Sequence, residues 1–194
     1  MNYFISDTHF FQQKLLYDQS FSKREFLLLD DLHETLIKNW NKQVKPSDTV
    51  YHLGDIAFVA AKKQAYQAVL ELLLNLNGHL IFVKGNHDSR NLFKYLAENE
   101  KNFVFYDVGV LLKLNHYQLY LTHYPLSLDK NQKILNLHGH LHHKMVHHSN
   151  NLNVCVDSLD AEYLTHKPPF GQPFSEQDIF EMAQNKQRDF QKMR

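Results

Sequence analysis

Cysteine is nearly absent from this chain of 194 residues, which contains only Cys155. A disulfide within the chain is therefore excluded, and the composition is typical of a reducing compartment. Proline and glycine are also scarce, with five and six residues, and the one cluster that contains both lies at 168–173. The sequence shows no linker, repeat or low-complexity stretch, so we expect one domain over residues 1–194.

Charge of either sign is not in excess, because 21 lysines and arginines balance 21 aspartates and glutamates. This balance gives no electrostatic footprint for duplex DNA or an anionic membrane. No hydrophobic run approaches the roughly 18–20 residues that cross a bilayer, and the start MNYFISDTHF lacks the features of a secretion signal. With 43% hydrophobic residues a packed core is expected. We therefore expect a soluble, cytoplasmic protein with no membrane partner.

The first half of the chain alternates strand patterns with helix patterns. Apolar runs at 3–6, 49–53 and 79–83 predict buried strands. A possible capping box, Ser22-x-x-Glu25, predicts a helix that begins there and ends near residue 41. Further helices are expected at 59–76 and 89–97. This order favours parallel strands joined by helical crossovers.

In the second half, short strands follow one another with little helix between them. They are expected at 108–114, 117–122, 134–137 and 152–156, with a tight turn at Asn115-His116. Ser175-x-x-Asp178 is a capping signal and predicts a C-terminal helix from about 175. The fold class that follows is α/β, with a two-layered mixed β-sheet core flanked by helices.

Histidine is the compositional anomaly, with 14 residues, and many of these lie just beyond predicted strands. Ligands of open α/β sheets bind in the crevice beyond the carboxyl ends of the strands. Taken singly, such clusters are ordinary turn chemistry. Five in succession, each after a strand, favour a metal site. The clusters are Asp7-x-His9, Gly54-Asp55, Gly85-Asn86-His87-Asp88, Thr122-His123 and Gly139-His140-Leu141-His142.

The donor types are consistent with a transition-metal centre. Asp and His supply hard oxygen and borderline nitrogen ligands, which suit Mn, Fe, Zn, Ni or Co better than calcium. Residues i and i+2 of a strand share a face, so Asp7 is expected beside His9, and His140 beside His142. Seven ligands are too many for one tetrahedral ion and suit two ions that share a carboxylate. Such a pair stabilises the attacking and leaving oxygens of a phosphoryl displacement.

This series of motifs resembles the pattern of calcineurin-like metallophosphoesterases, in particular small bacterial or phage-type members. The family pattern is D-x-H, G-D, G-N-H-[DE], H and G-H-x-H. It is met in order by FISDTHF, YHLGDIA, VKGNHDSR, LTHYPL and LHGHLHH, between residues 4 and 143. The resemblance implies that family's fold and a hydrolase acting on phosphoric ester bonds. Phe11 and Gln12 depart from the Gly and His that related chains often carry there, so no substrate preference is carried over.

The resemblance also implies roles for single residues. Asp7, His9 and His142 would hold one divalent metal ion. Asn86, His123 and His140 would hold the second, and Asp55 would bridge the two. A hydroxide between the ions would attack phosphorus, and manganese is the ion favoured for activity. His87 would be the general acid and Asp88 would hold its imidazole in position.

Other features leave alternatives open. Arg90 is either a phosphate clamp or a solvated arginine at a helix start. An open pocket is expected, with its rim at about 10–22, 125–133 and 158–174. The leading hypothesis is hydrolysis of a small phosphorylated substrate, most simply a phosphodiester or nucleotide. A nuclease acting on nucleic acid ends is disfavoured by the neutral charge, and a non-catalytic metal-binding scaffold is disfavoured by the presence of His87.

Overall fold

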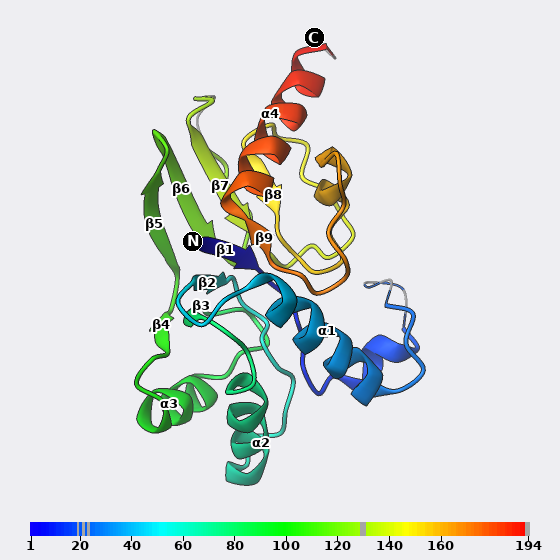
Figure 1. Ribbon diagram of the computed structural model, residues 1–194, viewed down its shortest axis with the longest axis vertical. Coiled ribbons are helices and arrows are strands. Elements are labelled where there is room, and N and C mark those ends of the chain that lie inside the picture. The colour runs from blue at the N-terminus through cyan, green and yellow to red at the C-terminus, as the bar shows by residue number, and fades with distance from the viewer. Residues whose placement is uncertain (19, 21, 23, 129–130, 193–194) are drawn as a thin grey trace.

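The computed structural model describes residues 1–18, 20, 22, 24–128 and 131–192, and its strands form two sheets (Figure 1). The first sheet has the order β4-β3-β2-β1-β9, and only β9 is antiparallel to its neighbour. Its strands are β1 (Asn2–Ile5), β2 (Thr49–His52), β3 (His79–Val83), β4 (Val104–Tyr106) and β9 (Phe174–Ser175). Since β1, β2 and β3 are parallel, their carboxyl ends meet at one edge.

The second sheet has the order β5-β6-β7-β8, in which β5 and β6 form an antiparallel hairpin and the other pairs are parallel. Its strands are β5 (Gly109–Leu114), β6 (Tyr117–Thr122), β7 (Ile134–His138) and β8 (Asn151–Asn153). The hairpin register pairs Leu114 with Tyr117, so the turn has two residues. Both Asn115 and His116 have positive φ, as this type of tight turn requires. The predicted turn is confirmed.

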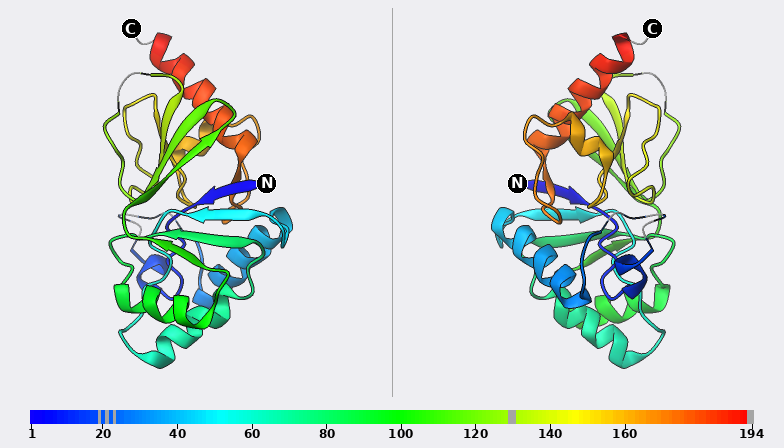
Figure 2. Two further views of the ribbon diagram at one scale, coloured as in Figure 1. Left: turned by 90° about the vertical axis from the view of Figure 1, so that its left-hand side faces the viewer. Right: turned by 90° about the vertical axis from the view of Figure 1, so that its right-hand side faces the viewer.

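The helices cover the sheets on separate sides. They are α1 (Leu29–Gln43), α2 (Lys63–Leu73), α3 (Arg90–Asn99) and α4 (Glu176–Lys192), with short 3-10 helices η1 (Gln13–Leu16) and η2 (Leu159–Tyr163). Figure 2 shows α1, α2 and α3 on one side of the first sheet, with the second sheet and α4 on the other. Two apolar cores result. One lies under α1–α3, and the other lies between the sheets and against α4. The predicted α/β class with two mixed sheets flanked by helices is confirmed.

Two helix starts differ from their predictions. The Ser22-x-x-Glu25 capping box does not form, because the Ser22 hydroxyl donates to Asp157 and α1 begins only at Leu29. Position 23 lies outside the described residues. The helix expected from residue 59 begins at Lys63, because the preceding chain continues alongside the first loop, where Phe10 pairs with Ala57. By contrast, Ser175 and Asp178 cap each other at the start of α4. In the part of the chain that the structure describes, every helix is too short or too polar to span a bilayer.

Candidate metal centre

The backbone around the predicted ligands adopts an unusual conformation. Five of the seven have positive φ, namely Asp7 (57°), His9 (48°), Asp55 (55°), His140 (72°) and His142 (51°). Left-handed backbone is uncommon for residues other than glycine and concentrates at functional sites. Asp7 lies beside His9 as expected, but strand alternation is not the cause. β1 ends at Ile5 and β7 at His138, and it is the left-handed loops beyond them that turn the side chains inward.

One group of side chains that could hold a cation consists of Asp7, His9 and His142, whose ligand atoms lie within 4.8 Å of one another. His9 Nε2 lies 3.6 Å from Asp7 Oδ1, and His142 Nε2 lies 3.8 Å from the same oxygen. All three residues are buried. The first two come from the loop after β1, and His142 comes from the loop after β7. The group therefore joins the two sheets.

A second group shares Asp7 and adds Asp55 and His123, again within 4.8 Å. Asp55 Oδ2 lies 3.6 Å from His9 Nε2 and 3.5 Å from His123 Nε2, between the two groups. His123 Nδ1 lies 2.9 Å from the Leu53 carbonyl oxygen. As a donor to that carbonyl, Nδ1 carries the ring proton, which leaves Nε2 as the ligand atom.

Asn86 and His140 complete the predicted set on the more exposed side. Asn86 Oδ1 lies 2.9 Å from His123 Nε2 and 2.9 Å from His140 Nδ1. The His140 backbone N–H donates to the Asp7 carboxylate at 3.0 Å from Oδ2. The structure thus brings all seven predicted ligands into one connected cluster, with Asp55 in the middle.

The buried charges strongly shift the acid–base equilibria. Burial would raise the pKa of the Asp7 carboxyl, but His9 and His142 outweigh burial and hold the pKa well below its usual range. Burial also lowers the pKa of His9, against the attraction of Asp7. The pKa of His140 is lowered by its burial and by the neighbouring His123. Ionised aspartates and neutral imidazoles are the forms that bind metal ions.

The residues present fit a bound cation. Both ring nitrogens of His9 are buried and have no hydrogen-bond partner among the described residues. A buried imidazole without a partner is costly, and a cation beside Nε2 would remove that cost. Two glycines give the carboxylates their space, because an added Cβ would lie 2.2 Å from Asp55 Oδ1 at Gly85 and 2.4 Å from Asp7 Oδ2 at Gly139.

Asp88 does not play the predicted part. Its carboxylate is 2% exposed and accepts hydrogen bonds from the backbone N–H groups of Gly85, Asp55 and Ile56 at 2.8–2.9 Å. Among the described residues, no hydrogen bond joins it to His87. Asp88 therefore fastens the loop after β2 to the loop after β3. Burial and the charge of Asp55 raise the pKa of Asp88 to about 6, although the three N–H donors lower it.

His87 lies at the exposed edge of the cluster. Its ring lies edge-on to the His9 ring with centroids 5.5 Å apart, and its backbone N–H donates to Asp55 Oδ1 at 2.8 Å. Two half-exposed aromatic rings flank the centre, Phe58 against His87 and Tyr124 against His140. Arg90 is exposed at the start of α3, and its side chain makes no hydrogen bond or ion pair within the described residues.

Sequence reasoning missed a buried ionic network behind the centre. Asp157 Oδ2 lies 3.3 Å from His142 Nδ1 and 3.5 Å from Arg24 Nε. The one available signal was that Asp157 follows an apolar strand, NVCV, as the predicted ligands follow theirs. Arg24 gave no such signal, because an isolated arginine in an irregular segment usually lies at the surface.

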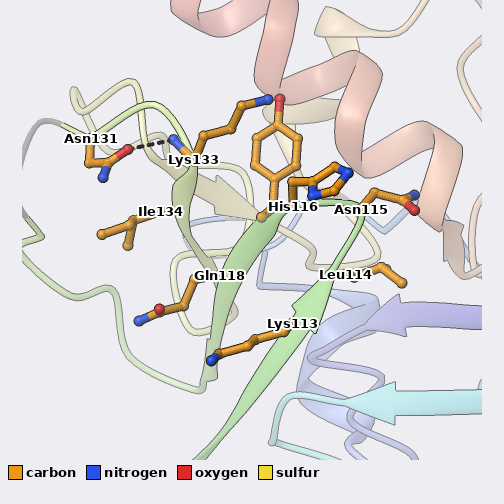
Figure 3. A pocket seen from close by; sticks show the side chains of 9 residues that line it. Lys113, Leu114, Asn115, His116, Gln118, Asn131, Lys133 and Ile134 are labelled. Atoms are coloured by element: carbon orange, nitrogen blue, oxygen red, sulfur yellow. Dashed lines mark hydrogen bonds between the residues drawn. The ribbon is translucent and has the colours of Figure 1, made fainter.

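Two cavities among the described residues lie at different places in the fold. A cavity of about 500 Å³ lies at the turn between β5 and β6 and the start of β7, with Lys113, His116 and Lys133 in its lining (Figure 3). These are the amino ends of β6 and β7, opposite the edge that carries the ligands. A cavity of about 240 Å³ lies beside Asp157, under the loop 167–172. The second cavity is lined partly by residues of the expected rim at 158–174 but by none of the predicted ligands, so that rim stays a prediction. Positions 19, 21, 129 and 130 of the other expected rims lie outside the described residues.

Comparisons with known proteins agree with this geometry. A family model described as calcineurin-like phosphoesterase matches residues 3–189. An uncharacterized protein of Methanocaldococcus jannaschii is 33% identical over 152 residues, which cover 78% of this chain and 71% of that protein. The gene 66 protein of Mycobacterium phage D29 is 27% identical over 171 residues, covering 74% and 79% of the two chains.

The fold is shared with a solved structure, a protein of unknown function from Aquifex aeolicus. It superposes with a TM-score of 0.63 at 23% identity and covers 94% of this chain and 98% of its own. The motif series, the clustered ligands between two mixed sheets and the match over residues 3–189 all lead to one assignment. The chain belongs to the calcineurin-like phosphoesterase family.

Proposed function

We propose that this chain is a dinuclear metal-dependent phosphoesterase that hydrolyses a small phosphodiester or nucleotide, with His87 as the general acid. The observation that carries the proposal is the position of His87 at the solvent edge of the ligand cluster, 5.5 Å from His9 between ring centroids. Family membership supports phosphoester hydrolysis in general. The single cysteine supports a reducing, cytoplasmic location, and the span of the match supports one catalytic domain.

The chain's own residues would divide the work as follows. Asp7, His9 and His142 would hold one divalent cation, and Asn86, His123 and His140 the other, with Asp55 between them. Bound cations would make hydroxide available near neutral pH and would neutralise charge on the phosphoryl oxygens. The His87 imidazolium would give its proton to the departing oxygen as the bond from phosphorus to that oxygen breaks. Asp55 would hold the loop of His87 through its 2.8 Å hydrogen bond.

Substrate class is suggested by the two rings beside the centre. Phe58 and Tyr124 are 50% and 51% exposed, and each contacts a histidine of the cluster. Exposed aromatic faces stack on nucleobases with little regard to sequence. Esters that carry a flat ring, such as cyclic nucleotides and dinucleotides, therefore fit the surface between Phe58 and Tyr124 better than sugar phosphates do. We propose manganese as the activating ion, since Asp, Asn and His together suit it.

The test compares two leaving groups. Metal-free protein supplied with Mn²⁺ should hydrolyse both an activated aryl phosphodiester and a nucleoside phosphodiester. His87→Ala should lower kcat for the nucleoside ester by about 10²–10⁴-fold, the usual contribution of a positioned general acid. It should lower kcat for the aryl ester much less, because an acidic phenol leaves without protonation. Manganese content should stay at two equivalents.

The control is His116→Ala, which removes an exposed imidazole at the opposite end of the second sheet. It should change neither rate. Equal losses for both leaving groups in His87→Ala would contradict the acid role. Turnover confined to single-stranded oligonucleotides would show that the substrate is nucleic acid ends and not a small ester. The absence of turnover with every divalent ion tested would refute the proposal that the chain is an enzyme.

A further inference from the structure

A buried carboxylate supports His142 from the side opposite to the candidate cation. The Asp157 side chain is 4% exposed, and its Oδ2 accepts a hydrogen bond of 2.7 Å from the Ser22 hydroxyl. The same oxygen lies 3.3 Å from His142 Nδ1. The other ring nitrogen, Nε2, faces Asp7 Oδ1 at 3.8 Å. The imidazole of His142 therefore lies between a structural carboxylate and a candidate metal ligand.

The contacts of Asp157 set the tautomer of His142. Asp157 Oδ2 also lies 3.5 Å from Arg24 Nε and accepts the Ser22 hydroxyl at 2.7 Å, which are the contacts of an ionised carboxylate. An ionised carboxylate can only accept hydrogen bonds, so Nδ1 of His142 must carry the proton that it donates. Nε2 is then left with a lone pair directed at the candidate cation position, as in the carboxylate–histidine–metal arrangements of known metal sites.

Arg24 links this support to the other ligand loop. Its guanidinium is completely buried, donates to the Thr8 carbonyl at 2.9 Å and also donates to the Asp7 carbonyl. Its Nε lies 3.5 Å from Asp157 Oδ2. One buried cation thus compensates the Asp157 charge and fastens the left-handed loop that carries Asp7 and His9. A buried charge without a partner would be costly, so each of the pair depends on the other.

We propose that Asp157 and Arg24 are positioning residues that prepare the cation position of Asp7, His9 and His142, and leave the position of Asn86, His123 and His140 to other supports. The second position has its own orienting contact, from His123 Nδ1 to the Leu53 carbonyl. The inference rests on the proposed dinuclear centre. It predicts that damage to Asp157 weakens one of two cation sites selectively.

The experiment titrates metal-free protein with Mn²⁺ and follows binding by calorimetry and electron paramagnetic resonance. The wild type should bind two equivalents. Asp157→Asn should bind one equivalent as before and the other about 10–100-fold more weakly, the usual loss when a ligand's outer partner is removed. The spin-coupled signal of paired Mn²⁺ ions should disappear at concentrations that fill only the tighter site.

The matched control is Asp160→Asn. Asp160 is also a fully buried carboxylate and pairs with Lys186 at 2.9 Å, but within the described part of the chain no hydrogen bond or ion pair is seen between it and a predicted ligand. This substitution should lower thermal stability and leave both Mn²⁺ affinities unchanged. A general effect of losing any buried carboxylate would weaken binding in both variants, and that result would overturn the inference.

A second measurement keeps the inference testable if Asp157→Asn does not fold. Nitrogen-15 NMR of the zinc-loaded wild type should find the His142 proton on Nδ1, and the milder Ser22→Ala should weaken the same site in part. A proton on Nε2 of His142, or two unchanged affinities in a folded Asp157→Asn, would overturn the inference. If the wild type binds no divalent cation, the proposed function fails with it; if the wild type binds two and the variants match it, only the inference fails.

Discussion

A side chain introduced at Gly85 would directly displace Asp55, the proposed bridging ligand. A Cβ built at this position lies 2.2 Å from Asp55 Oδ1 and 2.3 Å from the Asp55 backbone nitrogen. Ordinary contact begins at 3.4 Å, so Gly85→Ala requires Asp55 Oδ1 and the Gly85 backbone to separate by 3.4 − 2.2 = 1.2 Å. Rotation of the Asp55 side chain alone would not relieve the clash, because the Asp55 backbone nitrogen is also too close and Asp88 holds the backbone of both residues.

A shift of this size exceeds the tolerance of a metal site. Distances from ligand to metal vary by only about 0.2 Å in working sites, and a misplacement of about 1 Å can cost about 10²-fold in rate. Gly85→Ala should therefore lose one equivalent of Mn²⁺ and at least about 10²-fold in kcat. Overpacking should also cost about 1–3 kcal/mol, which lowers Tm by about 2–12 °C in a chain of this size.

The assay combines metal analysis, turnover and thermal unfolding of the metal-free protein. The control is Gly78→Ala, at the opposite end of β3, where φ is +104° and the new Cβ would meet Val44 at 3.1 Å. It should be destabilised to a similar extent and still bind two equivalents with normal turnover. Gly85→Ala with two tightly bound ions and full activity would refute the reasoning, because Asp55 would then not need the space that glycine provides.

Two further predictions concern stability. Asp88→Asn should destabilise the metal-free protein by about 2–4 kcal/mol in urea unfolding, because hydrogen bonds to a charged group contribute about 1.5–3 kcal/mol each and the amide replaces the three of Asp88 only in part. The reference is Asp107→Asn at an exposed position. An equally small loss of stability in both variants would contradict the role of Asp88 in fastening the two loops. Stability of the metal-free protein should also fall as pH drops below about 6.5, because burial lowers the pKa of His52 to about 3 and of His138 to about 4, so that the unfolded chain alone binds these protons. Each histidine contributes up to about 1.4 kcal/mol per pH unit in that window, and a flat urea midpoint between pH 7 and pH 5 would disprove it.

Strands with their own hydrophobic pattern could be predicted from the sequence. β3 (His79–Val83) and β6 (Tyr117–Thr122) match the prediction residue for residue, because polar turn residues bound each apolar run. β4 and β9 were missed, since strands of three and two residues exist only through pairing with β3 and β1. Such pairing is a tertiary effect that no local pattern encodes.

The clustering of the seven candidate ligands could be predicted because their motifs lie within short segments, whereas the supporting contacts could not. Asp88 is adjacent to His87 in sequence, yet two of its three partners, Asp55 and Ile56, lie 33 and 32 residues away. Asp157 and Ser22 are separated by 135 residues and meet only in the folded chain. The contacts that orient the cluster depend on the loop geometry, which the left-handed residues set and the sequence pattern does not reveal.

The origin of the ligands on two sheets has a mechanical consequence. Asp7, His9, Asp55 and Asn86 follow strands of the first sheet, and His123, His140 and His142 follow strands of the second. A cation held by Asp7 and His142 would link residues that are 135 positions apart and would do so reversibly. The single cysteine cannot form a disulfide within the chain, so such a cation would be the crosslink between the two sheets. The availability of the metal ion would then set how strongly the two sheets are held together.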